Sequence, residues 1–422
     1  MQKQDFLDDQ QFQRHICLYL HMHQPYRVRP YTIFDVDQHH DYFNAPSGDK
    51  TNNRDIFLKV AEKSYRPTLK MLLKLAKTEP KFKVSLSIPG MTLEQAEEYA
   101  PDILDKLRDL VATGKCELVA ETYYHSLAFF YDLPEFEAQV KQQMDTFKRL
   151  FGVTPTSFRG TELSYNNHLG KWAASAGFKA ILAEGWDKVL GWRSPNFVYE
   201  PWHTDGNAAL LLKNYRLSDD IAFRFSDHNW KEHPLSVEKY LHWCETATLQ
   251  GPLLNLFMDF ETFGEHQWAD SGIFEFFDKF VQRWCSDPSN DFLRIDEAAE
   301  ILPKVAEISM PETVTWADTE RDLSAWTGNK MQQEALKEIY SLSPDITQLP
   351  KSQTQAQILD DWRKLQTSDH PYYMCTKYWS DGDVHAYFSP YESPYFAYLY
   401  WANAVRDLKD RLAQAKISKN SR

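Results

Sequence analysis

Acidic, histidine and arginine side chains follow several short apolar segments of this chain. One such residue alone is often a hydrogen-bonded core group or a helix cap. Burying many of them together without solvent or a ligand would be costly, so their joint occurrence indicates a hydrated or ligand-filled cleft. The groups at the ends of the four richest segments are His21, His23 and Gln24; Glu117, Glu121 and His125; Arg159 and Glu162; and Asp259, Glu261 and Glu265.

Two of these carboxyl groups suit the cleavage of a glycosidic bond. That reaction needs one carboxylate as nucleophile or base and a second carboxyl as general acid, and a retaining enzyme holds the two roughly 5–5.5 Å apart. Glu162 and Asp259 come from different segments and fit these roles. The histidines and Gln24 would bind sugar hydroxyls, and the 13 Trp and 22 Tyr residues would offer flat faces for sugar rings.

Metal-dependent hydrolysis is the competing chemistry. His21 and His23 share one face of a strand, and together with Asp259 they resemble the zinc-binding pattern of the amidohydrolase superfamily. That pattern also needs histidines after two later strands, where this chain has "LAEG" and "KNYRLSDD". We therefore expect no metal and no cofactor, and keep a metal-dependent hydrolase on a barrel as an alternative.

Seven short β-rich segments carry these groups, and most are followed by a helical pattern. The alternation predicts an α/β fold built from βα units around a parallel sheet. We expect an irregular seven-stranded (β/α) TIM-like barrel, in which the carboxyl ends of the strands share one face, with a doubly wound sheet as the second choice. The segments are "ICLYLHMH", "FKVSLSIPG", "KCELVAETYY", "TSFRGTE", "FKAILAEG", "AALLLKNYRL" and "LLNLFMDFETF".

The segments between and after these strands predict the rest of the architecture. Residues 92–115 place apolar side chains at helical spacing and predict one amphipathic helix that stops at Gly114, whereas residues 27–53 lack periodicity and predict a long loop. Beyond residue 300, "MQQEALKEIYSL" and "YESPYFAYLYWANAVRDLKDRLAQA" have helical patterns. We expect a catalytic barrel over residues 1–300 and a C-terminal helical bundle over residues 301–422.

Composition and charge exclude several classes of protein. A net charge of −13 without a Lys/Arg cluster disfavours nucleic acid as a partner. The chain has no apolar run long enough to span a bilayer and no apolar segment near its N-terminus, so we expect a soluble, cytoplasmic protein without a membrane partner. Its 5 scattered cysteines predict reduced thiols rather than disulfides or a zinc framework.

Five segments resemble, in the family's order, the signatures of glycoside hydrolase family 57, the α-amylase-type family outside the main amylase clan. Together they span most of the chain, which makes the match more specific than any single motif. The segments are "HMHQP" (21–25), "GKCELVAETYYHSL" (114–127), "FRGTELSYN" (158–166), "LFMDFETFGEH" (256–266) and "WADTERDLSAWTGN" (316–329). "RLSDDIAFRFS" (216–226) and "KYWSDGDVHAYFSPYESPY" (377–395) are most similar to the α-amylase-like branch.

The resemblance implies a fold, a reaction and roles for residues. The fold is an irregular seven-stranded barrel followed by a helical bundle that completes the cleft. Glu162 matches the nucleophile and Asp259 the general acid/base of a retaining reaction on α-1,4-linked glucans. Glu162 should stay ionised with help from Arg159, whereas Asp259 needs a raised pKa. The candidate substrate-binding residues are His21, His23, Gln24, Glu117, His125, Arg159, Trp186, Trp316 and Trp326.

The expected partner is an α-glucan or maltooligosaccharide. Hydrolysis, glucan transfer and branch formation share one covalent intermediate and differ in the acceptor, so the sequence leaves open an amylase or a glucanotransferase. A non-catalytic glycan-binding protein is the other alternative. Linkage preference, chain length and oligomeric state also stay open.

Overall fold

The computed structural model describes residues 13–377 and 387–420; residues 378–386 of the branch-specific segment lie outside this part. All seven predicted segments form strands, and β6, β9 and β10 are additional. The additional strands are short and carry few consecutive apolar residues, which is why the β-rich pattern missed them. The strands are β1 (Arg14–His21), β2 (Val84–Ser87), β3 (Cys116–Leu118), β4 (Ser157–Arg159), β5 (Ala180–Glu184), β6 (Val198–Pro201), β7 (Ala209–Lys213), β8 (Leu253–Asp259), β9 (Asn290–Phe292) and β10 (Lys304–Ile308).

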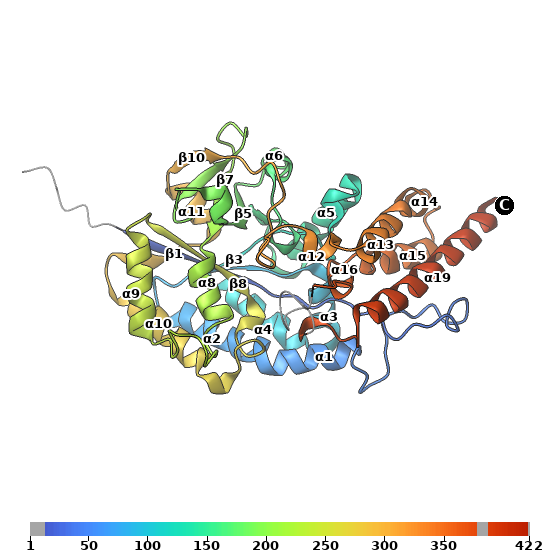
Figure 1. Cartoon of the computed structure of the whole chain (residues 1–422), viewed down its shortest axis with the longest axis horizontal. Coiled ribbons are helices and arrows are strands. Elements are labelled where there is room, and N and C mark those ends of the chain that lie inside the picture. The colour runs from blue at the N-terminus through green and yellow to red at the C-terminus, as the bar shows by residue number, and fades with distance from the viewer. Residues whose placement is uncertain (1–12, 378–386, 421–422) are drawn as a thin grey trace, which may run out of the picture.

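The strands form two mainly parallel sheets (Figure 1). The first has the order β3-β2-β1-β8, with β9 paired to the first residues of β1, and the second has the order β10-β6-β7-β5-β4, in which β6 and β7 run antiparallel. At the end of β1, His21 lies in register with Ser87 of β2 and with Asp259 of β8. The parallel pairing therefore brings His21 and Asp259 to the same edge of the first sheet.

Hydrogen bonds join the two sheets at two places. Ala120, just after β3, bonds through its backbone to Ser157 and Arg159 of β4, both at 2.9 Å. On the other side, the amide of Asn214 after β7 donates to the carbonyl of Asn255 in β8 at 2.9 Å. The structure thus shows an α/β protein with two parallel-rich sheets in contact. This pairing does not by itself show the irregular seven-stranded TIM-like barrel that the sequence predicts, which is a more detailed description of the fold.

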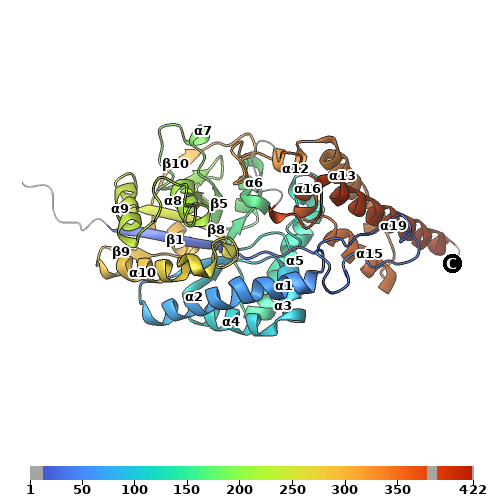
Figure 2. The ribbon, with the colours of Figure 1, turned by 60° about the horizontal axis from the view of Figure 1, so that its bottom comes forward.

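Helices pack against the sheets, and Figures 1 and 2 show α2, α4 and α10 on one side of the first sheet. Leu18 of β1, Leu72 of α2, Leu107 of α4 and Phe277 of α10 belong to one buried apolar cluster there. The helices of this part of the chain are α1 (Asn53–Val60), α2 (Arg66–Thr78), α3 (Gly90–Tyr99), α4 (Pro101–Ala112), α5 (Leu133–Phe151), α6 (Asn167–Ser175), α7 (Asp187–Leu190), α8 (Tyr215–Ala222), α9 (Val237–Thr248), α10 (Ile273–Ser286) and α11 (Ile295–Ile301).

The single helix expected over residues 92–115 is wrong, because the segment forms two helices, α3 and α4. Pro101 has no backbone N–H to continue the first helix, and Ala100 before it adopts a non-helical conformation with φ −150° and ψ 66°. Pro101 then occupies the first turn of α4, where its missing N–H costs nothing. The predicted stop is correct, since α4 ends before Gly114, whose φ is +72°.

The chain after β10 is mainly helical, and Figure 1 shows α13, α15 and α19 at the end of the long axis opposite α9. Trp401 of α19 donates to the Leu365 carbonyl at 3.1 Å, and Arg411 pairs with Asp361 at 2.7 Å. None of the helices in the described part of the chain is long and apolar enough to cross a membrane. The C-terminal helices are α12 (Ser324–Thr327), α13 (Lys330–Ser341), α14 (Ser343–Thr347), α15 (Gln353–Lys364), α16 (Asp369–Tyr373) and α19 (Pro394–Asn420).

The long loop after β1 has no regular element before α1, as its lack of periodicity predicted. It is fixed to α19 by the buried carboxylate of Asp407. This carboxylate accepts hydrogen bonds from the amide of Asp37 at 2.7 Å, from His40 at 2.8 Å and from the Tyr42 hydroxyl. The first loop and the last helix therefore pack as one unit beside the strand ends.

Candidate active site

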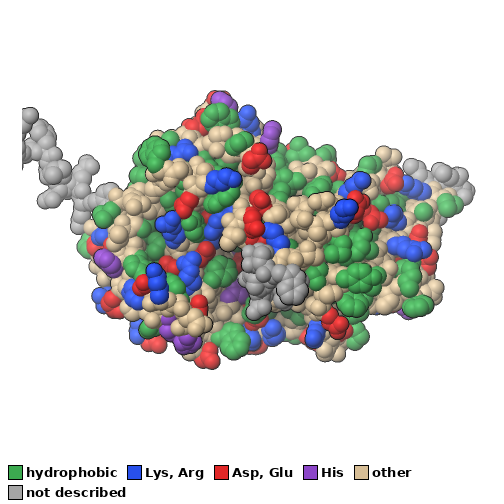
Figure 3. Space-filling model, in the orientation of Figure 1, with side chains coloured by type: hydrophobic (Ala, Val, Ile, Leu, Met, Phe, Trp, Pro, Cys, Tyr) green, Lys and Arg blue, Asp and Glu red, His purple; other side chains and the backbone are tan. Residues whose placement is uncertain are grey.

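A cleft of about 860 Å³ lies at the carboxyl ends of β1 and β8. Most of the sequence-predicted site residues line it, although they come from positions far apart in the chain. On the face of the molecule seen in Figure 3, acidic and basic side chains are interspersed rather than gathered by sign. The predicted residues that line the cleft are His21, His23, Gln24, His125, Glu162, Asp259, Trp316 and Trp326.

Glu162 lies in a tight turn directly after β4. Its backbone is left-handed, with φ 59° and ψ 30°, and Leu163 also has a positive φ of 53°. Such conformations are uncommon for residues with side chains and often occur at functional sites. The turn also requires Gly160, because a Cβ there would lie 2.2 Å from the Ser164 carbonyl oxygen. The sequence "FRGTE" thus forms the turn that directs Glu162 into the cleft.

Three donors hold the Glu162 carboxylate. His125 Nε2 lies 3.3 Å from Oε1, Ser368 Oγ donates to the same oxygen at 2.9 Å, and Trp316 Nε1 donates to Oε2 at 3.0 Å. Burial would raise the pKa of this carboxyl, but the hydrogen bond and positive charge of His125 outweigh it and lower the pKa below its usual range. Glu162 is therefore ionised at neutral pH.

His125 is held in turn by Glu121, which is fully buried. Glu121 accepts a hydrogen bond from His125 Nδ1 at 2.9 Å and one from Arg159 at 3.2 Å. Burial alone would lower the pKa of His125, but the hydrogen bonds to Glu121 and Glu162 raise it to about 9. His125 is thus a cation between two carboxylates. The expected help from Arg159 is indirect, because Arg159 contacts Glu121 and His21 rather than donating to Glu162.

Asp259 ends β8 and faces His21. His21 Nδ1 lies 3.8 Å from the Asp259 carboxylate, and its Nε2 lies 3.0 Å from Arg159 Nη1 and 3.2 Å from Glu121 Oε1. Burial would raise the pKa of Asp259, but the facing His21 and the charges of His266 and Arg159 lower it. The raised pKa expected for a general acid is therefore wrong for the protein without substrate.

Glu261, two residues after Asp259, has a raised pKa and keeps its own proton at neutral pH. Its side chain accepts hydrogen bonds from the Tyr65 hydroxyl at 2.6 Å and from the amide of His23 at 3.1 Å, and it lines the cleft. Burial and the negative charge of Asp259 raise the pKa of Glu261 to about 8. The sequence placed Glu261 beside Asp259, but the turn that follows β8 made its orientation impossible to predict.

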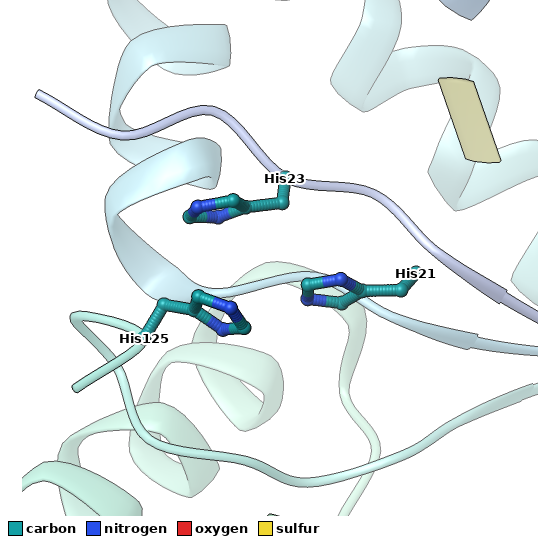
Figure 4. Close-up of side chains that lie close together, drawn as sticks. All are labelled: His21, His23 and His125. Carbon is teal, nitrogen blue, oxygen red and sulfur yellow. The ribbon is translucent and has the colours of Figure 1, made fainter. Parts of the chain in front are cut away.

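His21, His23 and His125 lie together, with ligand-capable nitrogens within 4.8 Å of one another (Figure 4). A metal held by three imidazoles needs lone pairs that point at one centre. Here the rings stack face to face, with centroids 4.8 Å apart for His21 and His125 and 5.5 Å apart for His21 and His23. Both ring nitrogens of His125 face carboxylates, Glu121 at 2.9 Å and Glu162 at 3.3 Å, and Nε2 of His21 faces the guanidinium of Arg159 at 3.0 Å. The cluster does not fit a metal ion.

His23 is fixed by Asp369, a residue of α16 that the sequence gave no reason to select. Asp369 Oδ2 lies 2.7 Å from His23 Nε2. Because a carboxylate can only accept here, Nε2 carries the proton. Burial lowers the pKa of His23 to about 4, so its ring is neutral and Nδ1 is a hydrogen-bond acceptor.

Three predicted binding residues are not brought to the cleft. Glu117 bonds to Ser85 at 2.7 Å, to Ser157 and to the Asp296 amide at 3.2 Å. Arg159 is fully buried behind His21. Trp186 is half-buried, packs against a core cluster and has Lys188 5.0 Å above its ring. Among the residues described, the cleft walls include none of these three.

Glu117 gives a test of this placement. Burial, and after it the charge of Asp296, raises its pKa to about 7. Between the usual carboxyl pKa and pH 7 the folded state then binds a proton that the unfolded state releases, so the free energy of unfolding falls as the pH rises through this range. Urea unfolding of Glu117→Gln should lose this contribution, and the variant should gain stability relative to wild type between pH 5 and pH 7. A difference that stays constant with pH would contradict this role.

The cleft combines an ionised carboxylate held by three donors, a second carboxyl on another strand, a neutral imidazole acceptor and tryptophan walls. This is the site of an enzyme that acts on glycosidic bonds. The chain belongs to glycosyl hydrolase family 57, whose sequence pattern matches residues 17–311.

Individual relatives agree with this family. A Methanocaldococcus jannaschii protein named "Putative alpha-amylase" is 41% identical over 412 residues, which cover 95% of this chain and 86% of the relative. A 4-alpha-glucanotransferase of Thermococcus litoralis is 24% identical over 200 residues, 47% of this chain and 28% of the relative. The structure of a GH57 branching enzyme from Thermococcus kodakaraensis shares the fold, with a TM-score of 0.68 at 13% identity over 94% of this chain and 90% of that chain.

Proposed function

We propose that this protein is a retaining glycoside hydrolase or transglycosylase that acts on α-1,4-linked glucans. The observation that carries the proposal is the pair Glu162 and Asp259 in one cleft, the first ionised and held by three donors. Family membership and relatives named for α-amylase and 4-α-glucanotransferase activity support an α-glucan as substrate. The seven parallel strands, joined at both edges, support an irregular barrel, and we expect the helical part after residue 300 to complete its cleft.

The first step uses both carboxyl groups. A lone pair of Glu162 attacks the anomeric carbon, the bond to the departing oxygen breaks, and Asp259 gives its proton to that oxygen. In the second step Asp259 takes a proton from water or from a sugar hydroxyl, which then displaces Glu162. Two inversions leave the product with the α configuration of the substrate.

Asp259 must be protonated for the first step, although its pKa is low in the free protein. Its side chain is 34% exposed to solvent in the cleft. A bound glucan displaces the water that solvates this carboxylate, and loss of solvation raises a carboxyl pKa. Glu261, with a pKa of about 8, is a nearby group that holds a proton at neutral pH. Substrate binding therefore favours transfer of a proton to Asp259.

The remaining cleft residues bind the sugar. The His23 ring lines the cleft and is fixed by Asp369, and Trp316 supplies an aromatic face while its indole N–H holds Glu162. Gln24 and Trp326 also line the cleft, but both side chains are buried, so they support its wall rather than offer an open face to a sugar. Trp316 thus links substrate contact to the position of the nucleophile.

Product analysis tests this function. We expect the protein to convert maltooligosaccharides and amylose to products that appear first as the α anomer, which proton NMR during the first minutes distinguishes from the β anomer. Products longer than the substrate would identify glucan transfer, and their absence with accumulating reducing ends would identify hydrolysis. First-formed β anomer would contradict the retaining mechanism, and absence of any turnover would favour the glycan-binding alternative.

A further inference from the structure

The start of α16 reaches the nucleophile from the C-terminal part of the chain. Thr367 and Ser368 are fully buried, and Thr367 forms an isolated antiparallel bridge with Ser126. The amide of Ser368 donates to the carbonyl of His125 at 2.9 Å. These backbone contacts fix the segment beside His125, so that the Ser368 hydroxyl lies 2.9 Å from Glu162 Oε1.

We infer that Ser368 is a positioning residue that, together with His125, occupies Oε1 of Glu162 and leaves Oε2 as the oxygen that attacks the anomeric carbon. The inference deepens the proposed function and rests on it. A carboxylate oxygen has two lone pairs in the plane of the group. Oε1 receives two donors, His125 Nε2 and Ser368 Oγ, whereas Oε2 receives one, Trp316 Nε1.

The second lone pair of Oε2 is therefore the one available for bond formation. As it forms the new bond to carbon, the electron pair of the breaking glycosidic bond goes to the departing oxygen, which takes the proton of Asp259. The donors on Oε1 fix the plane of the carboxylate and hold it ionised. The indole of Trp316 stays bonded to Oε2 on the side away from the new bond.

The hydroxyl of Ser368 is separable from the fold of its segment. The bridge and the amide hydrogen bond that fix this segment both use backbone atoms, and removing Oγ leaves them in place. If Ser368 had only a structural role, it would stabilise the fold through those backbone contacts. A positioning serine acts through Oγ on Glu162, which affects the rate and the ionisation of the nucleophile.

The experiment compares Ser368→Ala with the wild-type chain and with Thr248→Val. Thr248 is a buried hydroxyl that donates to a helix carbonyl in α9, away from the cleft, and serves as the matched control. Loss of a hydrogen bond to a charged group corresponds to roughly a 10- to 100-fold decrease in rate. We expect Ser368→Ala to lower kcat by that factor with little change in KM. The acidic limb of the kcat/KM profile should move to higher pH, because Glu162 loses a donor that favours its ionised form.

Thermal unfolding shows whether a loss of rate comes from loss of fold. A Ser368→Ala enzyme that unfolds with the wild type and has an unchanged rate and acidic limb would overturn the inference. So would a loss of rate that Thr248→Val reproduces, since it would reflect removal of any buried hydroxyl.

A second measurement separates this inference from the proposed function. In an Asp259→Ala background, α-glucosyl fluoride should form a glucosyl adduct on Glu162 that mass spectrometry of peptides detects, because fluoride leaves without acid help. Adding Ser368→Ala should slow adduct formation by the same 10- to 100-fold. Adduct formation at an unchanged rate contradicts the role of Ser368 and leaves the function standing, whereas an adduct on another residue contradicts the assignment of Glu162 itself.

Discussion

Replacement of Glu162 by glutamine is expected to lower kcat on maltooligosaccharides by roughly 10⁴-fold or more, the size of effect seen when a covalent nucleophile is removed. An amide of the same shape carries no negative charge and forms no stable bond to the anomeric carbon. Its oxygen still accepts a hydrogen bond, but His125 then keeps only one of its two carboxylate partners, Glu121. Substrate affinity should change much less than kcat, because the cleft walls remain.

The matched control is Glu297→Gln, which removes a carboxylate that pairs with Lys83 and lies outside the cleft walls among the described residues. This variant should keep wild-type activity. Initial rates by a reducing-end assay and affinity by calorimetry separate kcat from binding. Activity of Glu162→Gln near wild type would end the assignment of this nucleophile. Loss of wild-type activity with a chelator would instead support the metal-dependent alternative.

Much of the fold could be predicted because its central strands are apolar on both faces. Leu18, Leu182 and Leu256, in the middle of β1, β5 and β8, are fully buried, and runs of this kind are typical of parallel strands covered on both sides. Strand β6 has no such run, and it pairs antiparallel with β7 through a local turn. The sheet closure was harder to predict, because the two sheets are joined at Ala120 and at Asn255 through two hydrogen bonds each rather than through a long run of paired residues.

The candidate site was predictable where a side chain directly follows a strand. It was less predictable where the position of a side chain depends on the register between neighbouring strands. Glu117 and Glu121 lie on one face of the segment at β3, since strand side chains alternate. Glu117 is in register with Ser85 and thereby with Tyr19, two residues before His21, so its carboxylate is inside the sheet contact rather than at the strand ends. Glu121 lies at the level of the histidines. The register between strands decides which of the two carboxylates reaches the cleft, and a single sequence does not show that register.

Ser368 and Asp369 could not be found from sequence patterns. They lie about two hundred residues after Glu162, in a short helix without a chemical motif, and only tertiary packing brings them to it. The pKa values depend on the same packing. Glu261 and Asp259 differ by two positions, yet burial and the charge of Asp259 raise the pKa of Glu261, whereas His21, His266 and Arg159 lower that of Asp259.

Replacement of Asp259 by alanine is expected to remove acid and base catalysis while Glu162 stays active. On maltooligosaccharides, whose departing oxygen needs a proton, kcat/KM should fall by roughly 10²- to 10⁴-fold. On a substrate with an activated leaving group the first step needs no acid, so the glucosyl enzyme should form and then accumulate, because no base activates the water that releases it. A burst of leaving group followed by a slow steady state would report this accumulation.

Azide tests the second step of the reaction in the same Asp259→Ala variant. It is a nucleophile that needs no general base, so it should attack the accumulated glucosyl enzyme of Asp259→Ala and raise the steady-state rate. The product should be an α-glucosyl azide, because attack opposite Glu162 inverts the intermediate a second time. Asp270→Ala, which removes an exposed carboxylate in the loop after β8, should show neither the burst nor the azide effect. If azide leaves the rate of Asp259→Ala unchanged or yields the β-azide, Asp259 is not the acid/base of a retaining enzyme.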